Sequence, residues 1–316
     1  MRTLSGVQSS GQLHIGNYYG ALRQFLELQN EGEALYFIAN LHALTTVRDG
    51  ELARKLTLEC AAAFLALGLD PKKAVLFRQS DIAEVCELYW VLGTVVPNAH
   101  LDRAHSYKDK IAKGIAPNLG LYAYPVLMAV DILIYDSDVV PVGKDQKQHI
   151  EFARDWATMF NTTYKGEYFK LPNPSIQAAT ETVPGIDGEK MSKSRKNTID
   201  LFGEEKAVIK AIKSIKTDST LPEAPKPDGG PLHQLLKVMM PNADWETSWR
   251  AGGLGYGKYK DMLIEQYKAT FDGPRKRYAE LMADPAQIEV VLKDGAERAR
   301  AISAPVVARV RKAVGL

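Results

Sequence analysis

Short apolar runs alternate with longer amphipathic segments along the first half of the chain. Runs of strand length occur at Arg2–Val7, Ala34–Ile38, Ala74–Phe77 and Val139–Val142. Segments with helical periodicity lie between or after them, at 17–29, 51–69, 82–92, 121–135 and 146–160. Strands that alternate with helices predict an α/β fold, in which a parallel sheet is covered by helices on both faces. Asp145 stands at a capping position before the segment that begins at residue 146.

After about Pro184 the strand patterns fade. Helical patterns follow at 204–215, 232–240, 258–282 and 285–314. Pro305 predicts a kink or break in the last of these, because proline lacks the backbone N–H that a helix interior needs. The chain is therefore expected to form an α/β domain followed by a helical domain, with the boundary in the loop 184–198.

The amino-acid composition excludes few classes of protein. The 316 residues are 46% hydrophobic and 25% charged, and the net charge of +2 neither demands nor excludes a nucleic-acid partner. No membrane span is expected, because the longest apolar stretches, such as Tyr122–Tyr135, are short and contain Asp131. Cys60 and Cys86 lack C-x-x-C spacing, which indicates a reduced, cytoplasmic setting and no cluster held by cysteines alone.

The first candidate for chemistry is the segment Ser9–Asn17, where the first strand gives way to the first helix. A helix start at the carboxyl edge of a sheet offers free N–H groups to an anion. Gly16 permits close approach of a ligand, and His14 and Asn17 add polar side chains. The dinucleotide pattern G-x-G-x-x-G is not met. Taken alone, a capped helix with a surface histidine explains these residues equally well.

The second candidate is the glycine-flanked segment Lys190-Met191-Ser192-Lys193-Ser194. Two lysines three residues apart and two hydroxyl groups suit phosphates whose charge moves during a reaction. Taken alone, a solvated basic linker is the better explanation.

The two segments together identify a protein family far more specifically than either one alone. An H-I-G-N at the first helix and a K-M-S-K-S about 175 residues later resemble the two ATP-binding motifs of class I aminoacyl-tRNA synthetases. Gly6–Gly11, Leu41–Thr45, Tyr124–Leu133 and Val140–Glu151 are similar to the bacterial tryptophanyl branch of that family. Asn17 stands where the wider class has a second histidine, and the tryptophanyl branch also has asparagine there. The resemblance runs from Met1 to the C-terminus.

The resemblance implies a fold and an activity. The fold is a Rossmann-like catalytic domain at 1–188, then the K-M-S-K-S loop and a helical anticodon-recognition domain at 189–316, in a cytoplasmic homodimer. The activity is ATP-dependent conversion of L-tryptophan to its adenylate and transfer to tRNA(Trp), with AMP and diphosphate as products. Mg²⁺ is expected to arrive with ATP, bound chiefly by its phosphates, and no protein-bound metal cluster is expected.

The resemblance also implies site residues. The ATP-binding residues are Gln8, Ser9, Ser10, Gly16, Asn17, Gly143, Lys144, Asp145, Val183, Lys190, Met191, Ser192, Lys193 and Ser194. The catalytic residues are His14, Asn17, Lys110, Lys190 and Lys193. Lys108 and Lys110 resemble a pair that reaches pyrophosphate, although a solvated turn explains them nearly as well.

Tyr124, Met128 and Asp131 share one face of a predicted helix. An unpaired carboxylate on an apolar face costs several kcal/mol, so Asp131 must have a partner. By resemblance that partner is the indole N–H of tryptophan, with Met128 against the ring and Tyr124 and Gln146 on the ammonium group. His42, Val140 and Val142 would line the same pocket.

Two other functions compete. A tyrosine–tRNA ligase usually has glutamine where Met128 stands, so Met128 favours tryptophan. A non-catalytic relative often loses the phosphate motifs, and both are whole here. The basic residues Arg298, Arg300, Arg309, Arg311 and Lys312 form either a stripe that faces tRNA or a solvated helix face, and the second is favoured.

Overall fold

The computed structural model describes most of the chain. The described residues are 1–104, 116, 118–143, 146–176 and 183–316. The predicted site residues Lys110, Lys144 and Asp145 lie outside them, as does Lys108.

The described residues form a five-stranded parallel sheet in the strand order β3-β2-β1-β4-β5. The strands are β1 (Arg2–Val7), β2 (Glu33–Ile38), β3 (Ala74–Arg78), β4 (Val139–Val142) and β5 (Asn173–Ile176). The predicted α/β fold with a parallel sheet is confirmed. Because the chain winds outward from β1 in one direction and then continues through β4 in the other, the strand order reverses between these two strands, where open α/β sheets bind ligands.

The pairing between β1 and β4 is short, and the residues of these two strands explain why. β1 pairs with β4 at Thr3 and Val139, near the start of both strands. Two residues on, Pro141 has no N–H to donate, and its carbonyl accepts a hydrogen bond from the Ser5 hydroxyl at 3.2 Å. The carboxyl ends of β1 and β4 are thus not paired with each other, although each stays paired with its outer neighbour, and they can border a cleft.

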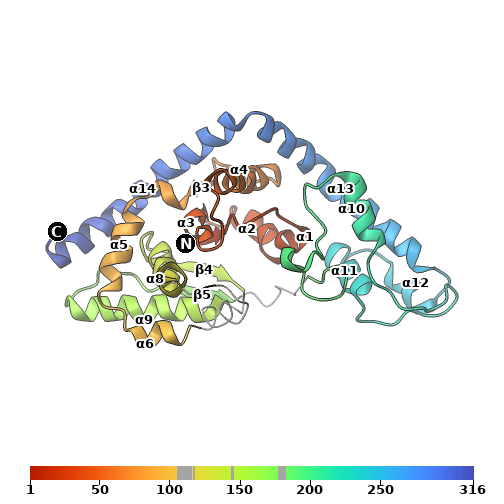
Figure 1. The fold of residues 1–316 in the computed structure, drawn as a ribbon, viewed down its shortest axis with the longest axis horizontal. Coiled ribbons are helices and arrows are strands. Elements are labelled where there is room, and N and C mark those ends of the chain that lie inside the picture. Colours follow the sequence, from red (N-terminus) through yellow and green to blue (C-terminus); the bar gives the residue numbers. More distant parts are fainter. Residues whose placement is uncertain (105–115, 117, 144–145, 177–182) are drawn as a thin grey trace.

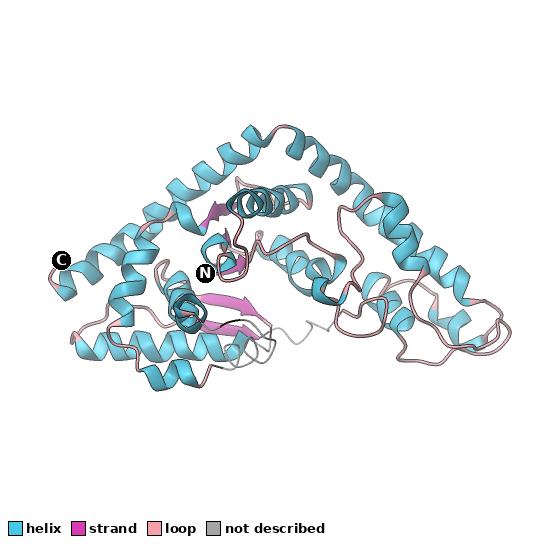
Figure 2. Ribbon diagram, viewed as in Figure 1, coloured by secondary structure: helices cyan, strands magenta, loops and turns pink. Residues whose placement is uncertain are grey.

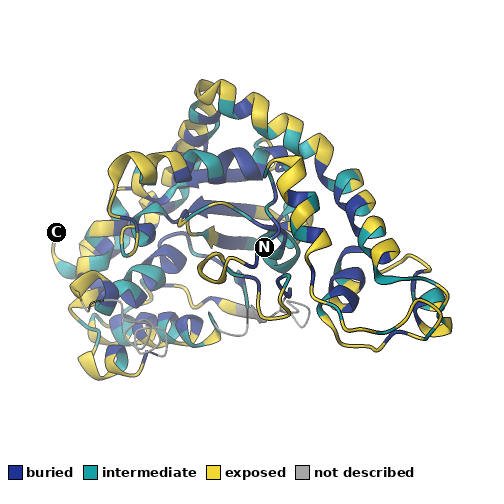
Figure 3. Cartoon of the chain, turned by 45° about the vertical axis from the view of Figure 1, so that its right-hand side comes forward, coloured by how far each residue is buried: buried dark blue, intermediate teal, exposed yellow. Residues whose placement is uncertain are grey.

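Helices cover both faces of the sheet (Figure 2). Leu35 and Phe37 face a core shared with α5 (Glu84–Gly93), α8 (Leu119–Leu133) and α9 (Lys147–Thr163). Ala34, Tyr36 and Ile38 point the other way, toward α2 (Arg23–Leu28) and α4 (Gly50–Ala66). The buried strands between partly exposed helices are visible in Figure 3.

Two long helices connect the parts of the molecule. α13 (Tyr256–Ala283) and α14 (Pro285–Val314) meet at an angle and run toward opposite ends of the molecule (Figure 1). α14 packs against β3 so closely that a β-carbon on Gly295 would lie 1.8 Å from the Leu76 carbonyl oxygen. The helix therefore covers an edge of the sheet and joins the first half of the chain to the last.

Of the kink or break predicted at Pro305, the break is wrong, since α14 continues to Val314. Pro305 and Ala301, whose carbonyl loses its helical donor, both lie on the exposed side of the helix. Water can therefore satisfy that carbonyl, so the proline costs less than it would in a core.

A second core supports the helical part. It unites α10 (Glu205–Lys213), α11 (Pro231–Met239), α12 (Glu246–Ala251) and α13. Ile15, at the start of α1 (Ile15–Asn17), and Met191 of the predicted phosphate loop also belong to it. Both candidate motifs are thus anchored in the same core.

The four arginines among these basic residues of α14 form neither a free stripe nor a merely solvated face, whereas Lys312 is exposed. Arg298 and Arg300 donate to the backbone oxygens of Pro71 and Asp81, each at 2.6 Å. Arg309 pairs with Asp136, and Arg311 donates to Glu87 at 2.6 Å. These arginines hold α14 to the first half of the chain.

Candidate active site

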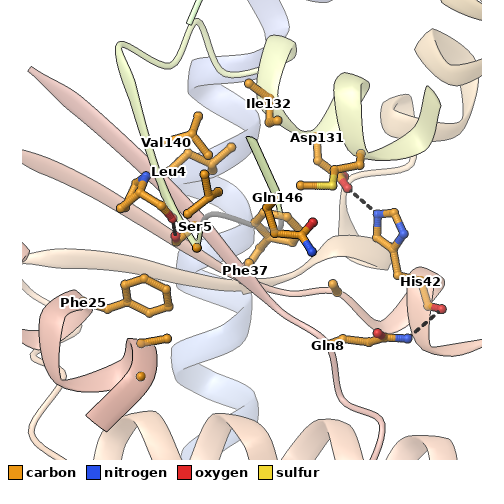
Figure 4. Close-up of a pocket in the computed structure, with 18 of the residues that line it drawn as sticks. Leu4, Ser5, Gln8, Phe25, Phe37, His42, Asp131, Ile132, Val140 and Gln146 are labelled. Atoms are coloured by element: carbon orange, nitrogen blue, oxygen red, sulfur yellow. Dashed lines mark hydrogen bonds and ion pairs between the residues drawn. The ribbon is translucent and has the colours of Figure 1, made fainter. Parts of the chain in front are cut away.

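A cavity of about 470 Å³ lies at the reversal of strand order (Figure 4). Leu4, Ser5 and Gln8 come to it from β1 and the residues after it, and Gly143 follows β4. The seven residues predicted to bind tryptophan all line it: His42, Tyr124, Met128, Asp131, Val140, Val142 and Gln146. The predicted ATP residues Gln8 and Gly143 line the same cavity, so the two predicted sites are adjacent.

Asp131 is the buried acid of this cavity, with 1% of its surface exposed. Its carboxylate accepts hydrogen bonds from Gln79 Nε2, at 2.8 Å from each oxygen, and lies 2.8 Å from His42 Nε2. Burial raises the pKa of Asp131, and the hydrogen bonds from His42 and Gln79 oppose that rise. The prediction that Asp131 must have a partner is confirmed, and two protein partners are His42 and Gln79.

Gln79 is absent from the predicted site. It is the first residue after β3, in the 3-10 turn η2 (Gln79–Asp81), and it is 1% exposed. Gln8 follows β1 and His42 lies in α3 (Asn40–Ala43), shortly after β2. A search of the residues that follow each predicted strand would have found Gln79 by the same rule.

One wall of the cavity comes from α8, through Tyr124, Met128 and Asp131, and from Gln146, which precedes α9. The hydroxyl of Tyr124 lies 3.2 Å from Nε2 of His149, which is buried in the first turn of α9. Gln8 Nε2 donates to the His42 carbonyl oxygen at 3.1 Å and so ties the end of β1 to α3. Figure 4 shows Gln8, His42 and Asp131 in a connected row beside the cavity.

The first motif begins a helical stretch that continues through Leu28. The Asn17 Oδ1 accepts from the backbone N–H of His14 at 3.0 Å, so this side chain caps its own helix. The Ser9 hydroxyl lies 3.3 Å from the Thr57 hydroxyl on α4, while Ser10 is exposed. A β-carbon on Gly16 would lie 2.9 Å from His14 Nδ1, so the glycine is needed for this packing.

Main-chain hydrogen bonds join the first motif to the chain just after the second. Ile15 N–H donates to the Ile199 carbonyl at 2.9 Å, and Leu201 N–H donates to the Leu13 carbonyl at 3.0 Å. His14 and Asp200 form the isolated antiparallel bridge between them. Residues some 185 positions apart, from 14 to 200, are thus fixed side by side.

The second motif has a rigid base and an exposed tip. Val183 and Met191 are buried, and Met191 N–H donates to the Val183 carbonyl at 3.0 Å. Buried Asn197 accepts from the Ser192 N–H at 2.8 Å. Ser192 and Ser194 share a hydroxyl–hydroxyl hydrogen bond of 2.8 Å. Lys190 and Lys193 are exposed as whole residues. The Lys193 ammonium nonetheless lies against Gly11, and partial burial lowers the pKa of this lysine.

His14, in the first motif, pairs with Asp200 just after the second motif and is 7% exposed. Burial, and then the nearby charge of Lys193, lower the pKa of His14 to about 4. Among the described residues no group hydrogen-bonds its Nδ1. The imidazole is therefore neutral near pH 7.

The described residues contain no group of three or more His, Cys, Asp or Glu side chains that could hold a metal ion. None of their helices combines the length and apolar character needed to span a membrane.

Known proteins resemble the chain over its whole length. A family model described as tRNA synthetases class I (W and Y) matches residues 1–303. Tryptophan–tRNA ligases of Rhodopirellula baltica and Campylobacter jejuni are 49% and 45% identical, each over 100% of both chains. The crystal structure of the Campylobacter jejuni tryptophanyl-tRNA synthetase complexed with ADP and tryptophan has a TM-score of 0.93 at 45% identity, again over 100% of both chains. This chain therefore belongs to the class I tRNA synthetases of the tryptophan and tyrosine family.

Proposed function

We propose that this chain is a tryptophan–tRNA ligase, which activates L-tryptophan with ATP and transfers it to tRNA(Trp). The observation that carries the proposal is the buried Asp131 acceptor in a cavity that Gln8, the residue just before the first motif, also lines. The relatives with the same name and full-length similarity support it. Met128 in the cavity wall favours tryptophan over tyrosine as the amino acid.

The reaction has two steps. A carboxylate oxygen of tryptophan attacks the α-phosphorus of ATP and pyrophosphate leaves; a hydroxyl of the terminal tRNA ribose then attacks the acyl carbon and AMP leaves. Neither step needs a covalent bond to the protein, so the protein acts by positioning the reactants and stabilising phosphate charge. In the first step Lys190 and Lys193 would stabilise the charge that moves onto pyrophosphate.

Each wall of the cavity has a role in this proposal. Asp131 would accept the indole N–H, Met128 would pack on the ring, and Tyr124 and Gln146 would hold the ammonium group. Gly143 and Gln8 would border the nucleotide, and His14 would lie near its phosphates. Mg²⁺ would be bound mainly by those phosphates, as is usual for this ion.

We also propose that the chain acts as a cytoplasmic homodimer that reads the anticodon with its helical part. Exposed apolar side chains support a partner surface near the cavity: Trp90 is 74%, Leu119 75% and Leu44 48% exposed. Leu44 also lines a groove of about 370 Å³ that shares His42 and Tyr124 with the cavity. Trp90→Glu should shift the sedimentation coefficient from dimer to monomer, and an unchanged value would contradict this surface.

Pyrophosphate exchange with tryptophan, tyrosine and phenylalanine tests the main proposal. ATP labelling that depends on tryptophan, with little response to the other two amino acids, is the expected result. Labelling that depends on tyrosine would instead identify a tyrosine–tRNA ligase. No labelling with any aromatic amino acid would indicate a non-catalytic relative.

A further inference from the structure

Gln79 connects the buried acid of the cavity to the backbone of α3. Its Oε1 accepts from the N–H groups of Leu41, at 3.1 Å, and His42, at 3.4 Å. Its Nε2 donates to both carboxylate oxygens of Asp131 at 2.8 Å. The side chain is 1% exposed, so water does not compete for these bonds.

These contacts fix which way the amide group points. Two backbone N–H donors face one end of the amide, so that end must be the oxygen. The NH₂ end must then face Asp131, and an NH₂ group can only donate. Both oxygens of Asp131 are therefore held as acceptors, which favours the ionised carboxylate despite its burial.

The same contacts leave acceptor capacity on one oxygen. Asp131 Oδ2 receives Gln79 and lies against His42, whereas Oδ1 receives Gln79. A carboxylate oxygen has two lone pairs, so Oδ1 can accept one more N–H. Asp131 lines the cavity, from which such a donor would come.

We propose that Gln79 is a specificity-determining positioning residue, which holds Asp131 as an oriented acceptor for the indole N–H of the substrate. The inference rests on the proposed function. Gln79 does not itself line the cavity and acts through Asp131. Without its two donated bonds, Asp131 can rotate or take up a proton, and it then no longer distinguishes a ring with an N–H from one without.

Asn40 provides a matched control. Like Gln79, it connects α3 to η2. Asn40 Nδ2 donates to the Ser80 hydroxyl at 2.8 Å, and Asn40 Oδ1 accepts from the Ser80 N–H at 3.1 Å. Neither group contacts Asp131. Asn40→Ala therefore loosens the connection between α3 and η2 without changing the donors to Asp131.

The experiment compares tryptophan with β-(3-benzothienyl)alanine, whose ring has sulfur in place of the indole N–H. Pyrophosphate exchange gives kcat/KM for each amino acid in wild type, Gln79→Met, Gln79→Glu and Asn40→Ala. Gln79→Met keeps the side-chain length without donors. Gln79→Glu keeps an oxygen for the Leu41 and His42 N–H groups. It places a second carboxylate oxygen where the amide NH₂ donated to Asp131.

We expect both Gln79 variants to lower the ratio of kcat/KM values, tryptophan over analogue, by roughly tenfold or more, as loss of hydrogen bonds to a buried charge does. The KM for ATP should stay near wild type, and Asn40→Ala should keep the wild-type ratio. Asn40→Ala, which loosens the same turn without removing a donor to Asp131, separates loss of that donor from a loosened turn.

An unchanged ratio in both Gln79 variants, with circular dichroism like that of wild type, would overturn the inference. An equal loss of selectivity in Asn40→Ala would also overturn it, because general loosening would then suffice. If wild type does not exchange with tryptophan at all, the proposed function fails instead, so the two failures are distinguishable.

Discussion

Lys193 folds back across Gly11, so that a β-carbon built on Gly11 would lie 2.9 Å from the Lys193 ammonium nitrogen. The φ angle of Gly11 is +149°, which residues with a side chain rarely adopt. The turn before the first motif is thus shaped to let the second motif approach it.

Replacing Gly11 should disturb this approach. Gly11→Ala strains the backbone and displaces Lys193, so the rate of adenylate formation should fall by about tenfold and the melting temperature by a few degrees. Stopped-flow measurement of adenylate formation checks the rate. Gly50→Ala is the control, because a β-carbon there meets open space. Equal rates in Gly11→Ala and wild type would mean that the contact has no role.

The two lysines of the loop should act mainly in the transition state. Lys190→Ala and Lys193→Ala should each lower kcat by on the order of 10²-fold or more, because each removes a charge near the leaving pyrophosphate. The KM for tryptophan should change little. Lys206→Ala, on the exposed side of α10, is the control. Near-normal single-turnover rates in both loop variants would rule out this role.

His14 should make stability depend on pH. Its folded-state pKa of about 4 lies below the ordinary value of 6.5, so between these pH values the unfolded chain binds a proton that the folded chain does not. Stability from this group is full above pH 6.5 and is lost as the pH falls toward 4. His14→Gln should therefore show a smaller drop in melting temperature between pH 7 and pH 4.5 than wild type. An equal drop in melting temperature in wild type and His14→Gln would contradict the lowered pKa of His14.

Binding of tRNA should weaken steeply with salt, whereas adenylate formation should not. The net charge is only +2, so an anionic partner must be held by local basic patches, and its binding releases counterions. Filter binding between about 50 and 200 mM salt should show a loss of affinity of at least tenfold. A tRNA affinity that is insensitive to salt would exclude an electrostatic surface.

Most of the fold could be predicted from periodicity, and the exceptions have physical causes. β5 was missed because Asn173, Pro174 and Ser175 are poor strand formers, which the outer position in the sheet tolerates. The attachment of α14 to β3 depends on contacts between residues more than 200 positions apart, such as Gly295 with Leu76. No local pattern carries that information.

The part of the site that consists of motif residues could be predicted from the sequence. The cavity gathers Asp131, His42 and Tyr124 as the resemblance implied, although their roles in binding stay predictions. Gln79 was missed because it belongs to no motif, and only its position just after a strand marks it. Its part in the network depends on bonds to Asp131 across 52 positions of sequence.

Asp131 is expected to select tryptophan by accepting its indole N–H. The most direct measurement is the ratio of kcat/KM values for tryptophan and phenylalanine in wild type and Asp131→Ala, with the melting temperature of both. Wild type should prefer tryptophan by ~10⁴–10⁵, because a buried acceptor left unpaired rejects the analogue. Asp131→Ala should lose most of that preference. A lower melting temperature with an unchanged ratio would mean that Asp131 only supports the fold through Gln79 and His42, and would contradict the claim.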